Sequence, residues 1–124
     1  MDGNELYFAQ SVIIANMDAP RYLCSQLVTM SWDVGATIAN LEEIQADGCV
    51  IESEIGIAVG DELEIRCGTV FFAGQVTKAE EHAFGWRISV TFSPLTPWRI
   101  EQFRPEHLFD PAAMARTAGG AETT

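Results

Sequence analysis

Residues 86–92 constrain the fold of this chain more than any other segment, because apolar and polar residues alternate there without a break. The apolar members are Trp86, Ile88, Val90 and Phe92, and the polar members are Arg87, Ser89 and Thr91. A period of two places every second side chain on one face of an extended strand, whereas a helix has a period of 3.6. The segment is therefore predicted to be a strand with one buried face and one solvated face, which is typical of antiparallel sheets.

Five further segments show the same alternation or are rich in residues that favour strands. They are residues 28–32, 36–40, 49–53, 62–67 and 70–76. Asp33-Val34-Gly35 supplies a turn, and Cys67-Gly68-Thr69 is a short hairpin connection in which Gly68 can adopt a positive φ. Six strands spaced roughly 10–15 residues apart predict an all-β protein, either an antiparallel barrel or a sandwich.

The sequence changes character after the last of these strands. Thr96-Pro97 reads as an N-cap followed by a first-turn proline, which predicts a short helix through about Phe103. Asp110-Pro111 repeats the pattern before residues 112–116. The region contains Trp98, Phe103, Leu108 and Phe109. We expect them to cover an open end or edge of the sheet, and the alternative is an exposed patch that binds a partner.

The chain of 124 residues is the size of one ordinary domain. We expect the barrel to span residues 20–93, a short helical cover to span residues 94–116, and a small polar tail at residues 117–124 to be disordered. Residues 1–19 form an N-terminal segment that we expect to be partly ordered. Within it, periodicity does not decide between a strand and a helical turn.

The charge balance excludes several kinds of partner. The chain has 7 basic and 18 acidic residues, which gives a net charge of −11. Such a field repels a phosphate backbone and an anionic membrane surface, so we expect no binding to nucleic acid. The longest apolar runs are about four residues, where a membrane span needs about 20, so no membrane insertion is expected. No lysine or arginine precedes Arg21, so the basic start of a signal peptide is missing and a cytoplasmic location is predicted.

The residue types that could carry catalysis or bind metal are few. Cys24, Cys49 and Cys67 are odd in number, form no CxxC pair and have apolar neighbours, so we expect buried thiols in a reducing compartment. A metal or catalytic role for one of them is the alternative. His82 and His107 have no ligand neighbours at metal-binding spacing. We therefore expect no metal, no cofactor and no enzymatic activity.

The tryptophans are the largest side chains available for packing. Trp86 is expected to point inward, and Trp32 ends its strand beside a turn and could point either way. Trp98 is the best candidate to cap the barrel, with its indole N–H donating to a carbonyl near the rim.

Five motifs follow one another in a recognisable order along residues 20–93. They are Arg21-Tyr22 before the first strand, Ile38-Ala39-Asn40-Leu41 leading into a loop that ends at Gly48, residues 59–65, Ala73-Gly74-Gln75-Val76, and residues 84–92. In this order they resemble the PilZ domain family, small β-barrels known as receptors of cyclic-di-GMP. The resemblance implies a six-stranded antiparallel β-barrel, followed here by short C-terminal helices.

The resemblance also implies a ligand-binding motif, which is degenerate in this chain. The family uses two arginines four apart and an Asp/Asn-x-Ser-x-x-Gly loop. Arg21 matches the second arginine, but Met17 stands at the first. Asn40 matches the leading residue of the loop motif, but Glu42 stands at the serine and Gly48 comes later than the motif requires. The candidate ligand-binding residues are therefore Arg21, Asn40 and Gly48.

The charge around this motif opposes an anionic ligand. Residues 22–65 contain no lysine or arginine and nine acids: Asp33, Glu42, Glu43, Asp47, Glu52, Glu54, Asp61, Glu62 and Glu64. Because cyclic-di-GMP carries two negative charges, its direct binding is expected to be weak or absent. Arg21 could contact phosphate or guanine, or it could pair with Asp18 or an acid of the loop. Arg66 and Arg87 could join Arg21 in an anion site or could lie on a solvated face.

The function implied by the resemblance is that of a bacterial signalling or adaptor domain with a protein partner. The alternative is a structural or protein-interaction β-barrel with no small-molecule ligand.

Overall fold

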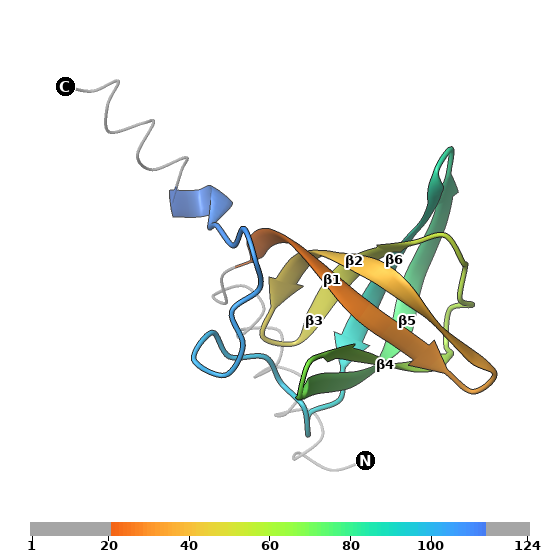
Figure 1. The fold of residues 1–124 in the computed structure, drawn as a ribbon, viewed down its shortest axis with the longest axis horizontal. Coiled ribbons are helices and arrows are strands. Elements are labelled where there is room, and N and C mark those ends of the chain that lie inside the picture. The colour runs from red at the N-terminus through yellow and green to blue at the C-terminus, as the bar shows by residue number, and fades with distance from the viewer. Residues whose placement is uncertain (1–20, 114–124) are drawn as a thin grey trace, which may run out of the picture.

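The computed structural model describes residues 21–113, and all six of its strands lie in one sheet (Figure 1). The strands are β1 (Tyr22–Trp32), β2 (Gly35–Gln45), β3 (Gly48–Ser53), β4 (Glu62–Cys67), β5 (Val70–His82) and β6 (Gly85–Phe92). Residues 1–19 and 117–124, for which we expected a partly ordered segment and a disordered tail, lie outside the described residues.

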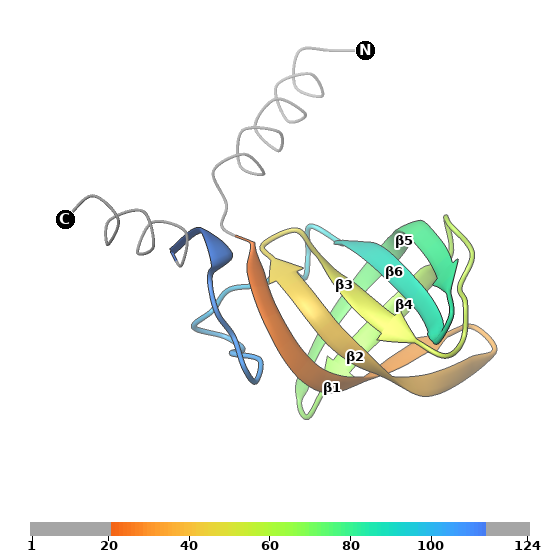
Figure 2. The same ribbon diagram turned by 90° about the horizontal axis from the view of Figure 1, so that it is seen from above.

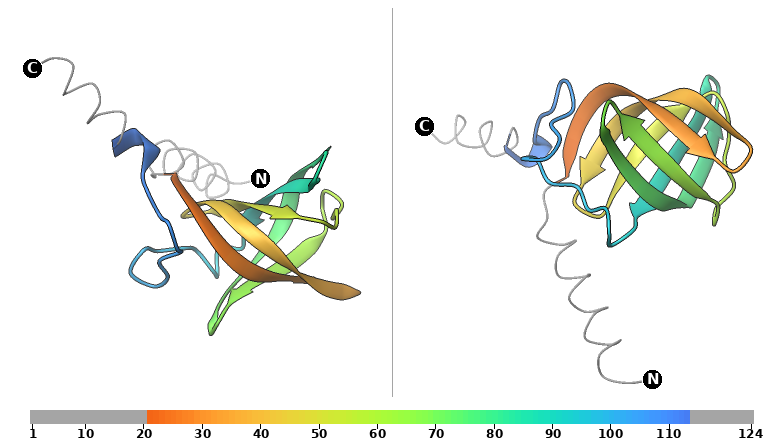
Figure 3. Two further views of the ribbon diagram at one scale, coloured as in Figure 1. Left: turned by 45° about the horizontal axis from the view of Figure 1, so that its top comes forward. Right: turned by 60° about the horizontal axis from the view of Figure 1, so that its bottom comes forward.

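The sheet closes into a barrel with the strand order β1-β2-β3-β6-β5-β4, and every neighbouring pair is antiparallel (Figure 3). This confirms the prediction of a six-stranded antiparallel β-barrel and excludes the open sandwich. The β1–β4 seam is the shortest ladder, from Thr29↔Arg66 to Ser31↔Glu64. Closure leaves few unpaired strand edges, which would otherwise invite association with another sheet.

The interior is filled by alternate residues of the strands, as the period of two requires. Its buried apolar members are Val28, Met30, Ala39, Leu41, Ile44, Cys49, Ile51, Ile57, Leu63, Ile65, Phe72, Val76, Ile88, Val90, Phe92 and Trp98. Phe72 and Phe92 stack at a centroid distance of 4.9 Å near one end of the barrel. Most apolar residues of the alternating segments lie in this core, which confirms their predicted inward faces, whereas Trp32, Cys67 and Trp86 are only partly buried and pack against it.

Two β-bulges make β2 and β5 longer than their alternation suggests. In β2, Leu41 pairs with Ile51 and Glu43 pairs with Val50, so Glu42 is an extra residue. The buried positions consequently shift from Ala39 and Leu41 to Ile44. β5 has a similar shift between Val76 and Lys78 and continues to His82. A bulge adds one residue to a strand, so the inward-pointing side chains beyond it fall one position later than strict alternation predicts. Alternation therefore predicts a strand that ends at the bulge.

The hairpin turns follow local residue chemistry. Gly68 has a φ of 62°, in the left-handed region, and the β4–β5 ladder reaches Cys67↔Val70 on either side of it. The predicted hairpin at Gly68 is therefore confirmed. The β5–β6 hairpin projects beyond the body of the barrel, with Phe84 in its turn (Figure 1).

The C-terminal segment lies across the end of the barrel where β1 begins (Figure 2). It joins the part of β1 that β4 does not reach: Leu23 and Phe109 exchange two backbone hydrogen bonds of 2.9 Å, and Ser25 N–H donates to the Glu106 carbonyl at 3.0 Å. At the opposite end, Ile57 of the β3–β4 connection is buried. Both ends of the barrel are thus closed by residues outside the strands.

The helix predicted from Pro97 to about Phe103 is wrong. The segment is extended apart from one turn, in which the Arg99 carbonyl accepts from the N–H groups of Gln102 and Phe103. The Thr96 hydroxyl does not cap a helix, because it bonds both the N–H and the carbonyl of Ala73 at 3.1 Å. Bonds to the barrel therefore take the place of the first helical turn. A helical turn does occur at residues 111–113, where Asp110 accepts from Ala112 N–H at 2.9 Å, as the second N-cap pattern predicted.

The segment still covers the barrel. Trp98 is 5% exposed and donates its indole N–H to the Phe103 carbonyl at 2.7 Å, which confirms the predicted cap. Phe103 and Leu108 pack against the core. Phe109 is the exception, because its side chain is 43% exposed and only its backbone joins β1.

The remaining packing predictions are confirmed in part. Trp86 and Trp32 are both partly buried and pack against the core. Cys49 is buried as expected, whereas Cys24 and Cys67 are only partly buried, and all three are free thiols.

Candidate functional site

Arg21 and Gly48, two of the three predicted ligand-binding residues, line one pocket of about 350 Å³. The pocket lies where β1 and β3 begin and β2 ends, and β6 forms its far wall. Its other lining residues are Glu43, Ile44, Gln45, Asp47, Cys49, Val50, Thr77, Ser89, Val90 and Thr91. We call it the Arg21 pocket.

Gly48 is required by the close approach of β3 and β6. A Cβ at this position would lie 2.4 Å from the Val90 carbonyl oxygen, which no larger residue can tolerate without moving the backbone. The glycine of the sequence motif therefore has a packing role in this pocket, whatever else it does.

The bulge at Glu42 positions the charged groups beside the pocket. Because Glu42 is the extra residue, Glu42 and Glu43 both reach Arg87 of β6. Arg87 donates one N–H to Glu42 at 2.8 Å and another to Glu43. Arg21 binds the other oxygen of Glu43 at 3.1 Å. A fork-shaped guanidinium suits such paired contacts with carboxylates.

This network leaves no excess positive charge in the pocket. Arg21 and Arg87 are balanced by Glu42 and Glu43, and Asp47 adds a further carboxylate to the lining. The Glu43 side chain is only 12% exposed, so its charge is held between the two arginines. Of the alternatives left open for Arg21, the structure shows pairing with an acid of the segment that leads to Gly48, and an anion at Arg21 would lie beside the Glu43 carboxylate.

The other expected members of the site lie elsewhere. Asn40 is in the middle of β2, where it pairs with Glu52 and accepts from the Ser25 hydroxyl at 3.3 Å, outside the Arg21 pocket. Arg66 pairs with Glu64 at 2.9 Å and lies over the Phe71 ring at 5.3 Å. Arg66 does not line the Arg21 pocket and its side chain is 49% exposed, so of the two alternatives the structure shows the solvated face.

Two residues that were not predicted as site residues line the Arg21 pocket at the spacing of the loop motif. Counting back from Gly48, the residues five and three positions earlier are Glu43 and Gln45, and both line the Arg21 pocket. This register needs no insertion, unlike the register that starts at Asn40. Alignment of the loop motif on Asn40 had assigned neither residue to the site.

Three groups in or near the Arg21 pocket have raised pKa values. Burial, together with a hydrogen bond and charge repulsion from Glu52, raises the pKa of Glu42, although Arg87 and Asn40 oppose the shift. Burial and the charges of Glu42 and Glu43 raise the pKa of Cys24 to about 11. Burial also raises the pKa of Cys49. These thiols are therefore protonated near neutral pH, which makes them poor nucleophiles.

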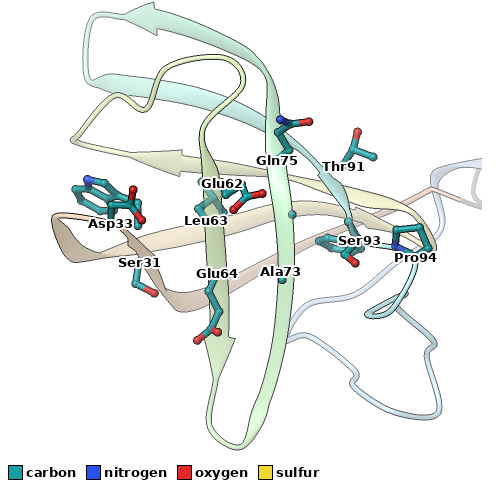
Figure 4. A pocket seen from close by; sticks show the side chains of 13 residues that line it. Ser31, Asp33, Glu62, Leu63, Glu64, Ala73, Gln75, Thr91, Ser93 and Pro94 are labelled. Carbon is teal, nitrogen blue, oxygen red and sulfur yellow. The ribbon is translucent and has the colours of Figure 1, made fainter.

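A wider cleft of about 760 Å³ lies on another part of the surface, between the end of β1 and the strands β4 to β6 (Figure 4). Asp33, Glu62 and Glu64 lie along it, and the described residues that line it include no histidine, cysteine, lysine or arginine.

Within residues 21–113, no histidine, cysteine, aspartate or glutamate side chains form a group of three or more that could hold a metal ion. In the same range, no helix is long and apolar enough to cross a membrane. No model of a known protein family matches the chain, and no curated protein matches it.

Proposed function

We propose that this protein is a non-enzymatic, PilZ-like signalling or adaptor domain of the cyclic-di-GMP receptor class, acting in the bacterial cytoplasm. The observation that carries the proposal is a closed six-stranded barrel in which one pocket is lined by Arg21, Glu43, Gln45 and Gly48. The barrel supports the resemblance, and the spacing of the last three residues supports the Asp/Asn-x-Ser-x-x-Gly motif in altered form.

The same residues make direct dinucleotide binding weak or absent. Met17 removes one guanidinium fork, Gln45 replaces a hydroxyl, and Glu43 occupies the remaining Arg21. Losing one charge-assisted pair costs about 2–5 kcal/mol of binding free energy. We therefore expect the protein to act through a protein partner rather than through a nucleotide.

Calorimetric titration with cyclic-di-GMP tests this proposal. The wild-type chain should show no low-micromolar binding. The double variant Met17→Arg with Gln45→Ser restores both missing groups and should bind measurably, because the pocket geometry remains.

The matched control is Met17→Arg with Glu42→Ser, which follows the Asn40 register and should not gain affinity. Equal gains in both double variants would contradict the register that starts at Glu43. Tight binding by the wild-type chain would contradict the loss of the ligand site.

A structural or protein-interaction barrel with no small-molecule ligand is the second candidate. It is favoured by the Arg21–Glu43–Arg87 network, in which both arginines beside the pocket are engaged in internal ion pairs. If neither double variant gains any affinity, this second candidate replaces the first.

A further inference from the structure

Three large apolar side chains on the outside of the barrel meet at one groove of about 420 Å³. Leu27 is 65% exposed, Ile38 is 67% exposed and Phe84 is 88% exposed. We call this surface the Phe84 groove. Single exposed apolar residues are common on proteins, but several around one hollow mark an interaction surface.

The three side chains come from two parts of the barrel. Leu27 faces Asn40 across the β1–β2 ladder, and Thr29 faces Ile38. Leu27 and Ile38 are therefore diagonal neighbours on one face of the sheet. Phe84 approaches from the turn of the projecting β5–β6 hairpin (Figure 1). The groove thus lies between the outer face of β1 and β2 and the turn of the β5–β6 hairpin.

The rim of the Phe84 groove is acidic. Glu52 and Glu54 line it, and the described lining residues include no lysine or arginine. His82 lies 3.3 Å from Glu52 at the same side of the barrel. Arg87, which pairs with Glu52 across the ladder, has its guanidinium bound to Glu42 and Glu43 instead. The carboxylates of the groove are therefore not neutralised by a basic side chain of the lining.

This combination selects one kind of occupant. An apolar floor accepts an apolar side chain, and the acidic rim favours lysine or arginine on either side of it. An anionic lipid surface would be repelled by the rim. A second copy of this chain would bring another net charge of −11 and is disfavoured for the same reason.

We propose that the Phe84 groove binds a peptide segment of a partner protein in which an apolar anchor is flanked by lysine or arginine. The inference rests on the adaptor function proposed above and names the surface that would serve it. The groove shares no lining residue with the Arg21 pocket. Peptide binding at the groove can therefore be tested separately from nucleotide binding at the pocket.

The probe is a short synthetic peptide of alternating lysine and leucine with one central phenylalanine, titrated into the isotope-labelled full chain. We expect saturable shifts of amide resonances confined to the lining of the groove: residues 27, 37–40, 52–54 and 84. Leu27→Ser or Phe84→Ser should weaken binding about fivefold or more, and Glu52→Gln with Glu54→Gln should make binding less sensitive to salt.

The chain offers matched controls in Val34→Ser and Leu95→Ser, which remove exposed apolar side chains outside the groove. They should leave the affinity unchanged. Shifts that spread over all acidic faces, or that centre on Asp33, Glu62 and Glu64, would overturn the proposal by showing charge attraction alone. Sedimentation that reveals a dimer dispersed by Phe84→Ser would overturn it in favour of a second copy.

Discussion

At the scale of single residues, Glu42 and Glu43 show how neighbouring side chains of one type can have opposite effects on the free energy of unfolding. Glu43 is nearly buried between Arg21 and Arg87, and its carboxylate accepts from both guanidinium groups. Glu42 contacts only Arg87 among the arginines, and burial, followed by the hydrogen bond and charge of Glu52, raises its pKa. Both carboxylates bind Arg87, and burial beside Glu52 disfavours the ionised form of Glu42.

Replacing Glu43 with Gln should lower the free energy of unfolding by about 1–3 kcal/mol at neutral pH, because two arginines lose a charged acceptor. Thermal unfolding followed by circular dichroism measures the change. Lys78→Gln, which breaks an exposed pair with Glu80, is the control and should alter stability by less than about 1 kcal/mol.

Glu42→Gln should behave in the opposite way and depend on pH. A raised folded-state pKa means that the contribution of Glu42 is fully present below its ordinary pKa of 4.5 and is lost as the pH rises through the higher folded value. The variant should therefore be at least as stable as wild type at neutral pH and gain no advantage at acidic pH. Equal losses of stability in the Glu42 and Glu43 variants at neutral pH would contradict this account.

At the scale of elements, the C-terminal segment behaves as part of the barrel even though it contains almost no regular structure. It contributes Trp98 to the core, the Thr96 hydroxyl to the backbone of β5, and backbone hydrogen bonds to β1. Trp98 also contacts the Tyr22 ring edge-on at 5.5 Å. The segment therefore pairs with the first residues of β1, where β4 forms no ladder with that strand.

Trp98→Ala should lower the free energy of unfolding by about 3–5 kcal/mol, because it leaves a cavity and unpairs the Phe103 carbonyl. Leu95→Ala, an exposed position in the same segment, should change it by less than about 0.5 kcal/mol.

Truncation after Ser93 should give an unfolded or aggregating product. A chain ending at Ser93 that unfolds cooperatively at an unchanged temperature would show that the segment is a detachable docking element instead.

At the scale of the whole molecule, the net charge of −11 opposes the compact state through self-repulsion. Acidic residues lie on several faces: along the wide cleft, at the rim of the Phe84 groove and in the Arg21 pocket. Partners with basic segments are favoured by this field, and phosphate-rich partners are opposed by it.

Raising sodium chloride from about 20 mM to about 150 mM should therefore stabilise the protein, with a rise in Tm of about 2–4 °C. Differential scanning fluorimetry measures the shift. Glu62→Gln combined with Glu81→Gln removes two exposed charges and should reduce the salt response. A Tm that falls with added salt would show that ion pairs such as Arg21–Glu43 outweigh the general repulsion.

Much of the architecture could be predicted from local patterns. Alternation along residues 86–92 and 62–67 identified two strands and their inward faces, and Gly68 identified a hairpin. The capping role of Trp98 followed from its size, its polar N–H and its position after the last strand. These features are predictable because the period of a strand and the φ of a glycine depend on residues close together in the chain.

The candidate site depended on what lies across the strands. The bulge at Glu42 arises from the pairing of β2 with β3, and the Arg87–Glu43 pair joins residues 44 positions apart. The predicted helix after Pro97 failed because bonds from Thr96 to Ala73 and from Trp98 to Ala46 replaced helical ones. Strand periodicity, turns and net charge were therefore determined by the sequence itself. Register, bulges and ion pairing were decided by the tertiary structure, because they depend on partners that only the closed barrel brings together.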